Sequence, residues 1–389
     1  MKKLLFIICI AVCTCSAFSQ TTQQIIDSAK ACISREQYLS AFSILEQTEE
    51  SNANLVVAVA SLINDYQTGF TVNLDQWKLD DKVNGKAVKS EFVKVPLENI
   101  LWSAAGQYPT DCRIHKEIYK LYVYVFKHRG AYLELKMLGE LNNAIEKQLH
   151  PQCPDYRSLY IMGYCYNAAG RLQTAIGNLQ KAIAGNTKFA PAYLELGKVY
   201  LQASELPNAI KQANTAFELY TEKSDKSRAA LLAGQAYEAN NENAKALNSY
   251  LLADSLYRKE FFTQRALLNM YVKTSNENAP KALNSFVGAQ GRDNLYAYMD
   301  ACDIYLKHNH PMDLALYCQK ALADYKGRTG VESCLNFTLG LIYKSINPDM
   351  ARQYFKKAKE QGLEASRFPP KRNHPDTAKR IEEAFKWVG

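Results

Sequence analysis

The sequence predicts an all-α fold, namely an α-solenoid of stacked antiparallel helix pairs with a small irregular insertion. Apolar residues recur at helical spacing along most of the chain, and strand-like alternation is confined to one short segment. A pattern of glycine, tyrosine and alanine recurs every 34 residues in the second half. Turn signals rich in asparagine and proline separate the helical stretches. Together these observations favour repeated helical hairpins over a generic helical bundle.

The first residues predict a secretory signal peptide over residues 1–19. Lys2 and Lys3 are followed by a short apolar run, and Ala17 and Ser19 occupy the small-residue positions that precede a cleavage site. The apolar run is too short to span a bilayer. Two cysteines in this leader lack the small preceding residue of a lipoprotein signal, which ranks a lipid anchor below a soluble product. We therefore expect an exported protein, periplasmic, secreted or associated with the cell envelope, with no membrane span in the mature chain.

Residues 20–150 predict a divergent helical region. Residues 25–49 form a candidate hairpin, and residues 55–66, 97–105, 112–126 and 132–147 extend the helical series. An insertion at residues 69–95 interrupts the pattern and predicts a short hairpin or an ordered loop, because a turn signal precedes an alternating run. Insertions in repeat proteins often carry binding, and Trp77 is the candidate contact residue of this one.

Residues 151–364 contain the regular repeats. Gly163 and Gly197 lie 34 residues apart, and each is followed by a tyrosine three residues on. Small residues recur at matching places, among them Ala175 and Ala182 in the first copy. A third copy centres on Gly234. Helices approach closely only where side chains are small, so we expect the glycine of one helix to face the two alanines of the next.

These residues resemble the tetratricopeptide repeat (TPR) family, whose 34-residue unit is a helix-turn-helix with a glycine and aromatic signature in helix A and small residues in helix B. The resemblance implies a right-handed superhelix of helix pairs. Three further copies are degraded, and in the fifth Cys302 replaces the glycine. Residues 365–389 predict a basic, proline-rich connector and a last amphipathic helix that caps the array.

Composition and motifs exclude several functions. Without the leader, 45 basic residues face 39 acidic ones, and this mild, dispersed charge does not indicate nucleic-acid binding. No nucleophile, phosphate-binding or HExxH signature is present, so we expect no enzyme and no cofactor. Seven cysteines remain, without zinc-ligand spacing, and most are expected to be small buried residues of undetermined pairing.

Two stretches of the sequence partly match metal-binding motifs, and we expect neither to bind a metal ion. Asp80, Asn84, Gly85 and Glu91 match part of a calcium-binding loop, but Lys82 occupies a ligand position. The sequence from 308 to 310, His-Asn-His, lies in a predicted turn without a nearby carboxylate or thiolate, which favours a surface turn over a metal site.

The resemblance also implies that helix A side chains facing away from helix B line a groove that binds a partner. Cations outnumber acids in this set, and its amide and cationic groups suit an extended peptide with carboxylates. The residues assigned to the groove are Arg157, Tyr160, Tyr164, Asn167, Lys198, Gln202, Arg228, Gln235, Glu238, Arg265, Asn269, Lys273, Asp303 and Lys307.

The leading hypothesis from the sequence is a non-enzymatic scaffold that binds a protein or peptide, with possible peripheral association with an envelope complex. The alternative is a glycan-capture module in which Trp77 presents an aromatic platform. A solvated face without a ligand and a hidden hydrolase complete the alternatives. The sequence does not identify the partner or the oligomeric state.

Overall fold

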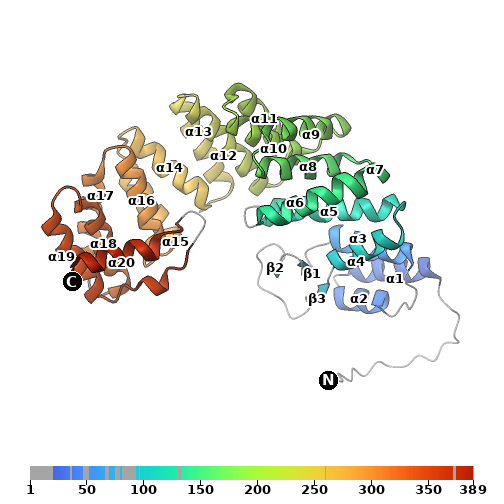
Figure 1. The fold of residues 1–389 in the computed structure, drawn as a ribbon, viewed down its shortest axis with the longest axis horizontal. Coiled ribbons are helices and arrows are strands. Elements are labelled where there is room, and N and C mark those ends of the chain that lie inside the picture. The colour runs from blue at the N-terminus through green and yellow to red at the C-terminus, as the bar shows by residue number, and fades with distance from the viewer. Residues whose placement is uncertain are drawn as a thin grey trace, which may run out of the picture. The chain divides into compact units, whose positions relative to one another are not determined.

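The computed structural model describes residues 21–35, 37–46, 52–65, 70–74, 79–80, 93–95, 97–129, 133–258, 260–370 and 374–388. The chain divides into two compact units, residues 1–186 (unit 1) and 187–389 (unit 2). Figure 1 shows the order of the elements along the chain. The predicted signal peptide lies outside the described residues. Among those described, no helix combines the length and the hydropathy of a membrane-spanning helix.

Unit 1 begins with the predicted helical hairpin. Helices α1 (Thr22–Ser34) and α2 (Tyr38–Glu46) pack against each other, and α3 (Ala53–Asp65) follows. Thr21 starts α1 with a capping box, because its side chain accepts from the Gln24 amide while the Gln24 side chain accepts from the Thr21 amide. The alanines Ala29 and Ala41 are fully buried, which lets the two helices approach closely.

The insertion folds into a small sheet. Strands β1 (Phe70–Leu74) and β2 (Leu79–Asp80) pair antiparallel. The turn that the sequence predicts, at residues 83–85, lies outside the described residues, so the hairpin around it stays a prediction. Strand β3 (Val93–Val95) pairs parallel with β1 on its other side, which the sequence did not indicate. Trp77 and the calcium-loop positions after Asp80 lie outside the described residues. The role of Trp77 as a contact residue and the expectation that this loop binds no calcium therefore both stay predictions.

Helices α4 (Leu97–Gln107), α5 (Cys112–Arg129) and α6 (Leu135–Ala144) continue unit 1. A π-helical turn, Ile145–Leu149, extends α6 into the short α7 (His150–Gln152). A disulfide joins Cys112, at the start of α5, to Cys153, just after α7, across a sequence separation of 41. The other described cysteines are free thiols, of which Cys32 is half-buried and the rest are buried, as expected for small core residues.

The first regular repeat closes unit 1 with α8 (Tyr156–Ala168) and α9 (Leu172–Gly185). A Cβ placed on Gly163 would lie 2.6 Å from Cγ of Leu179 and 3.4 Å from the carbonyl oxygen of Ala175. The close approach is therefore confirmed for Ala175, but Leu179 rather than Ala182 covers the glycine. A large side chain needs the space that the missing Cβ leaves, which explains the pairing.

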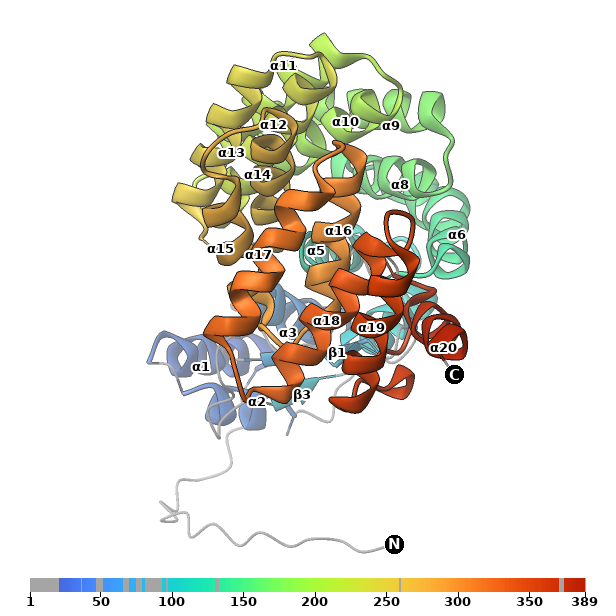
Figure 2. The same ribbon diagram turned by 90° about the vertical axis from the view of Figure 1, so that its left-hand side faces the viewer.

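Unit 2 contains the remaining repeats and confirms the predicted α-solenoid. Figures 1 and 2 show its helices succeeding one another in chain order. The pairs are α10 (Ala190–Gln202) and α11 (Leu206–Leu219), α12 (Lys223–Ala239) and α13 (Asn243–Leu256), α14 (Phe261–Lys273) and α15 (Ala279–Gln290), α16 (Leu295–Lys307) and α17 (Pro311–Asp324), and α18 (Thr329–Tyr343) and α19 (Pro348–Glu360).

A left-handed residue ends the first helix of successive pairs. Ser204, Asn241, Ser275 and Asn309 have φ between 50° and 61° at equivalent turns. This conformation terminates a helix and reverses the chain, and asparagine tolerates it better than most residues. The repeated geometry keeps the first helix of each pair, called helix A below, on the same face of unit 2.

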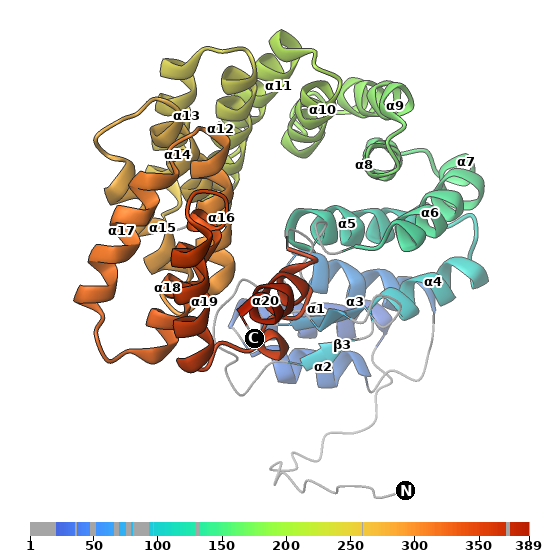
Figure 3. The same ribbon diagram turned by 60° about the vertical axis from the view of Figure 1, so that its left-hand side comes forward.

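The C-terminal segment packs against the last repeat. After a short 3₁₀ turn (Ala365–Arg367), α20 (Thr377–Val388) packs on α19. Figure 3 shows α20 beside α18 and α19. Phe385 meets Phe337 edge-on with ring centroids 6.3 Å apart, and Trp387 meets Phe355 at 6.1 Å. These contacts cover apolar side chains that would otherwise end the solenoid in water.

Candidate functional site

The residues predicted for the groove on α8 are covered by the preceding part of unit 1. Tyr160 and Asn167 are buried, with 5% and 8% of their surface exposed. The ring of Tyr164 stacks on Phe126 of α5, with centroids 4.0 Å apart and planes at 16°. Tyr160 and Asn167 are therefore core residues and not groove-lining residues. The repeat pattern missed this because a divergent helix, α5, occupies the place where the groove would open.

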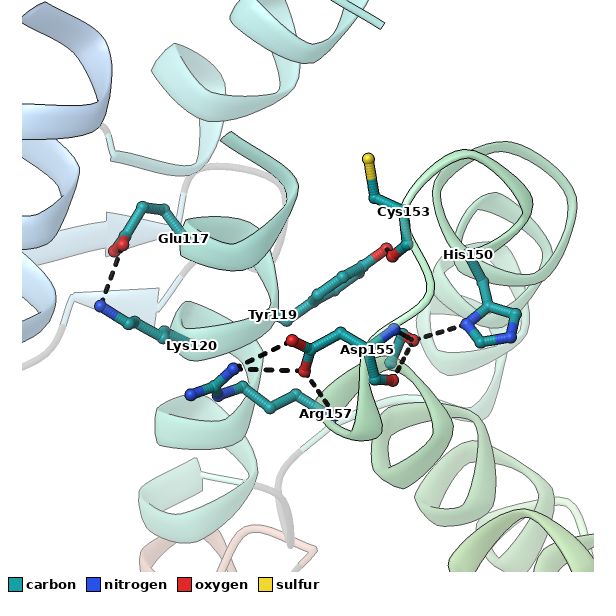
Figure 4. Close-up of polar contacts among 8 residues, drawn as sticks. Glu117, Tyr119, Lys120, His150, Cys153, Asp155 and Arg157 are labelled. Atoms are coloured by element: carbon teal, nitrogen blue, oxygen red, sulfur yellow. Dashed lines mark hydrogen bonds and ion pairs between the residues drawn. The ribbon is translucent and has the colours of Figure 1, made fainter. Parts of the chain in front are cut away.

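Arg157 belongs to a closed polar cluster beside the disulfide (Figure 4). Its Nη1 lies 3.2 Å from both carboxylate oxygens of Asp155, the residue that caps α8. The hydroxyl of Ser158 donates to the Asp155 carbonyl at 2.6 Å, and His150 Nδ1 lies 2.7 Å from the same hydroxyl. Tyr119 donates to the carbonyl of Cys153 at 3.3 Å. These contacts fix the start of α8 against α5.

The electrostatics of this cluster favour neutral groups. Burial raises the pKa of Tyr119 well above its ordinary value, and the negative charge of Asp155 raises it further. Burial also lowers the pKa of His150, with a smaller contribution from the cationic Lys181. A neutral phenol and a neutral imidazole inside a satisfied network indicate a structural role.

In unit 2, two of the predicted cations of the groove, Lys198 and Arg228, lie over buried acids of their own helices. Lys198 Nζ is 2.9 Å from Glu195, and Arg228 is 3.7 Å from Asp225. Glu195 and Asp225 are each only 3% exposed. These cations neutralise carboxylates of their own helices, so they are less able to bind a partner's carboxylate than the sequence suggested. The spacing of three residues between acid and base was the signal that could have revealed these pairs.

A polar ladder, formed by Glu238, Asn269 and His308, links helix A of three successive repeats. Asn269 donates from its side-chain amide to Glu238 at 2.7 Å, and its amide oxygen lies 3.0 Å from His308 Nε2. The other carboxylate oxygen of Glu238 accepts from the hydroxyl of Tyr250 at 2.7 Å. Two of these residues were predicted from the sequence. His308 was not, because its position beyond the regular pattern places it near Asn269 only in three dimensions.

Two lysines flank the polar ladder, and neither forms an ion pair within the described residues. Lys273 donates to the neutral side-chain oxygen of Asn243 at 3.0 Å, and Lys307 is exposed. The pKa of His308 is lowered, mainly by burial and then by the positive charges of Lys307 and Lys273. The positive charges of both lysines therefore act on the same histidine of the polar ladder. Gln202 on α10 and Gln235 on α12 are exposed.

The helix A face continues toward the C-terminus with acids instead of lysines. The Nε of Arg265 lies 2.8 Å from Oδ1 of Asp300, and His374 Nε2 lies 3.1 Å from Oδ2. Burial would raise the pKa of Asp300, but the hydrogen bonds from His374 and Arg265 outweigh it and lower the pKa. Asp303 has a raised pKa because its desolvation exceeds the opposing effect of Arg380 and His374.

A hollow of about 250 Å³ lies at the turns of the fourth and fifth repeats. His310 bridges its rim, with Nε2 3.2 Å from the Ser275 hydroxyl and Nδ1 3.2 Å from Asp313. The expectation that this turn lacks a nearby carboxylate is thus wrong, because one helical turn brings Asp313 back to His310. Asp313 is 68% exposed, and no group of three or more potential metal ligands was found among the described residues.

The comparisons with known proteins find matches among solved structures. No protein-family model matches the sequence, and no curated protein is similar to it. A tetratricopeptide repeat protein from Parabacteroides merdae has 17% identity and a TM-score of 0.40, covering 69% of this chain and 98% of that one. The APC/C hetero-tetramer Cut9–Hcn1 has 12% identity and a TM-score of 0.44. The match covers 90% of this chain but only 59% of the matched chain. These likenesses carry no argument about function.

Proposed function

We propose that the chain is a non-enzymatic scaffold of the bacterial cell envelope that binds an extended segment of a partner protein on the helix A face of unit 2. The observation that carries the proposal is the polar ladder of Glu238, Asn269 and His308, flanked by Lys273 and Lys307. In this part of the predicted groove, hydrogen bonds join side chains of three successive repeats. Lys273 and Lys307 form no ion pair with a carboxylate of the described residues.

The chemistry of this surface suits a peptide backbone with acidic side chains. An extended segment presents N–H and C=O groups at regular intervals, and amide, imidazole and carboxylate groups can satisfy them. Each of the two lysines, half-buried Lys273 and exposed Lys307, adds a charge contact of about 0.5 kcal/mol, which orients the segment more than it raises affinity. Binding should therefore weaken as salt concentration rises, because exposed charges are screened.

The envelope location is part of the proposal. It is supported by the leader pattern of residues 1–19. Peripheral association with an envelope complex would follow if the partner is itself anchored there. Cell fractionation of the full chain, compared with a version that lacks residues 2–19, tests the export step.

Site-specific photo-crosslinking tests the binding face. A photoreactive residue in place of Gln235, which is exposed on the helix A face, should give partner adducts in cells. The double variant Lys273→Glu and Lys307→Glu should reduce these adducts at least tenfold, because two attractions become repulsions. The matched control is Lys281→Glu and Lys320→Glu, which reverses two exposed lysines on the second helices of the same two repeats.

Adducts that are equally abundant in both double variants would contradict the proposed face. Adducts formed equally well from a photoreactive residue at Lys320 would contradict it too. Circular dichroism of each variant establishes that the helical fold is retained, so that a loss of adducts reports binding.

A further inference from the structure

The helix A face of the fifth repeat already holds part of the chain's own C-terminal connector, the segment between α19 and α20. Phe368 packs edge-on against Tyr296, with ring centroids 5.5 Å apart. The hydroxyl of Tyr296 donates to the backbone carbonyl of Pro369 at 2.5 Å. Phe368 is 6% exposed and Tyr296 is 8% exposed, so the contact is well enclosed. An aromatic side chain and a backbone carbonyl are thus recognised by a single tyrosine.

The same segment places a histidine on a buried acid. His374 Nε2 lies 3.1 Å from Asp300, and the imidazole ring lies 5.6 Å from the Tyr296 ring. His374 is 8% exposed and Asp300 4%. Asp300 also accepts from Arg265 at 2.8 Å, so its two oxygens are shared between a side chain of the solenoid and one of the connector.

Charge divides α16 into two halves. Asp300 and Asp303 lie in its middle, whereas Lys307 and His308 lie at its end, about one to two helical turns farther on. A partner segment that followed this helix would therefore meet an acid-lined region beside the aromatic contact and a basic region beside the polar ladder.

We propose that Tyr296, Asp300 and Asp303 form a binding site for a segment carrying an aromatic residue followed by a basic side chain that donates a hydrogen bond to Asp300, and that the connector is its resident occupant. A partner of this chemistry displaces Phe368, Pro369 and His374 and leaves α20 docked through Phe385 and Trp387. The inference rests on the proposed function in assigning recognition to the helix A face. It adds a second subsite of opposite charge and a competing segment within the chain.

The experiment measures binding of a fluorescein-labelled peptide of residues 365–376 to the full mature chain by anisotropy. Phe368→Ala with His374→Ala releases the connector and keeps the α20 contacts. We expect this released variant to bind the peptide at least tenfold more tightly than the unmodified chain does. Adding Asp300→Asn should weaken that binding at least tenfold. A peptide in which phenylalanine and histidine are both alanine should not bind.

Equal binding by the released variant and the unmodified chain would overturn the proposal, as would indifference to Asp300→Asn. If the released variant does not fold, hydrogen exchange of the unmodified chain decides instead. Excess peptide should then speed exchange in residues 365–370 and 374, and unchanged exchange overturns the proposal. Lys273→Glu with Lys307→Glu should leave peptide binding intact, so failure at this subsite is distinguishable from failure of the proposed function.

Discussion

Asp300 and Asp303 show how strongly single side chains depend on their partners. They are three residues apart on α16, yet hydrogen bonds from His374 and Arg265 lower the pKa of Asp300, whereas desolvation raises that of Asp303. A lowered pKa means that the folded state favours the charged form, and a raised pKa means the reverse. The two carboxylates therefore contribute to stability with opposite sign.

We predict that Asp300→Asn lowers the free energy of unfolding at pH 7 by about 3 kcal/mol, because it removes a buried carboxylate that accepts from both Arg265 and His374 and leaves these donors without their acceptor. Asp303→Asn should raise it. The contribution of Asp300 is present above its unfolded pKa, near 3.8, and is lost as pH falls through its lower folded pKa. Urea unfolding at pH 7 and pH 3 checks both signs, and effects of the same sign at pH 7 would refute the assignment.

Side-chain roles were the least predictable from the sequence. The repeat pattern placed Glu238 and Asn269 on a common face, and they are hydrogen-bonded. It also identified Arg265, but not the acid beneath it, because Asp300 is 35 residues away and belongs to the next repeat. Contacts of this kind depend on how successive repeats stack, which a single repeat does not specify.

Helix pairs were predicted well because close packing constrains few positions. A glycine where two helices cross leaves a clear signature, as at Gly163, which Leu179 covers. The parallel addition of β3 to the insertion had no such signature. The π-helical turn at Ile145–Leu149 had none either, since one extra residue per turn alters backbone hydrogen bonds but not composition.

We predict that Gly163→Ala destabilises the chain by about 1–3 kcal/mol, because the added methyl would overlap Leu179. Gly177 on α9 is the matched control. Nothing lies within 4 Å of a Cβ built there, so Gly177→Ala should stabilise by about 0.5–1 kcal/mol through helix propensity. Denaturant unfolding measures both, and destabilisation by Gly177→Ala would contradict the packing argument.

At the scale of the whole molecule, the sequence indicated the repeats and the cap but neither the division into units after Asn186 nor the disulfide. Cysteine pairing depends on which helices fold back on one another in the divergent region, and that region lacks a repeat register. A covering helix was expected because an apolar solenoid end must be covered, and α20 packs on α19 of the last repeat.

We predict that Phe385→Ala with Trp387→Ala destabilises the chain by about 3–5 kcal/mol and promotes self-association, because the apolar end of unit 2 loses its cover. The matched control is Lys379→Gln with Glu383→Gln, which removes an exposed ion pair of 4.0 Å from the same helix and should have little effect. Thermal melting and light scattering report both outcomes, and equal effects of the two pairs would exclude a capping role.

The disulfide has a mechanical consequence. Cys112 and Cys153 enclose a stretch with a sequence separation of 41, including α6 and the π-helical turn. If the chain is pulled from its two ends, tension passes through the sulfur bridge and bypasses that stretch, which as a fully extended strand would add roughly 140 Å. Under load, the bridge would make unit 1 shorter and stiffer than its residue count implies.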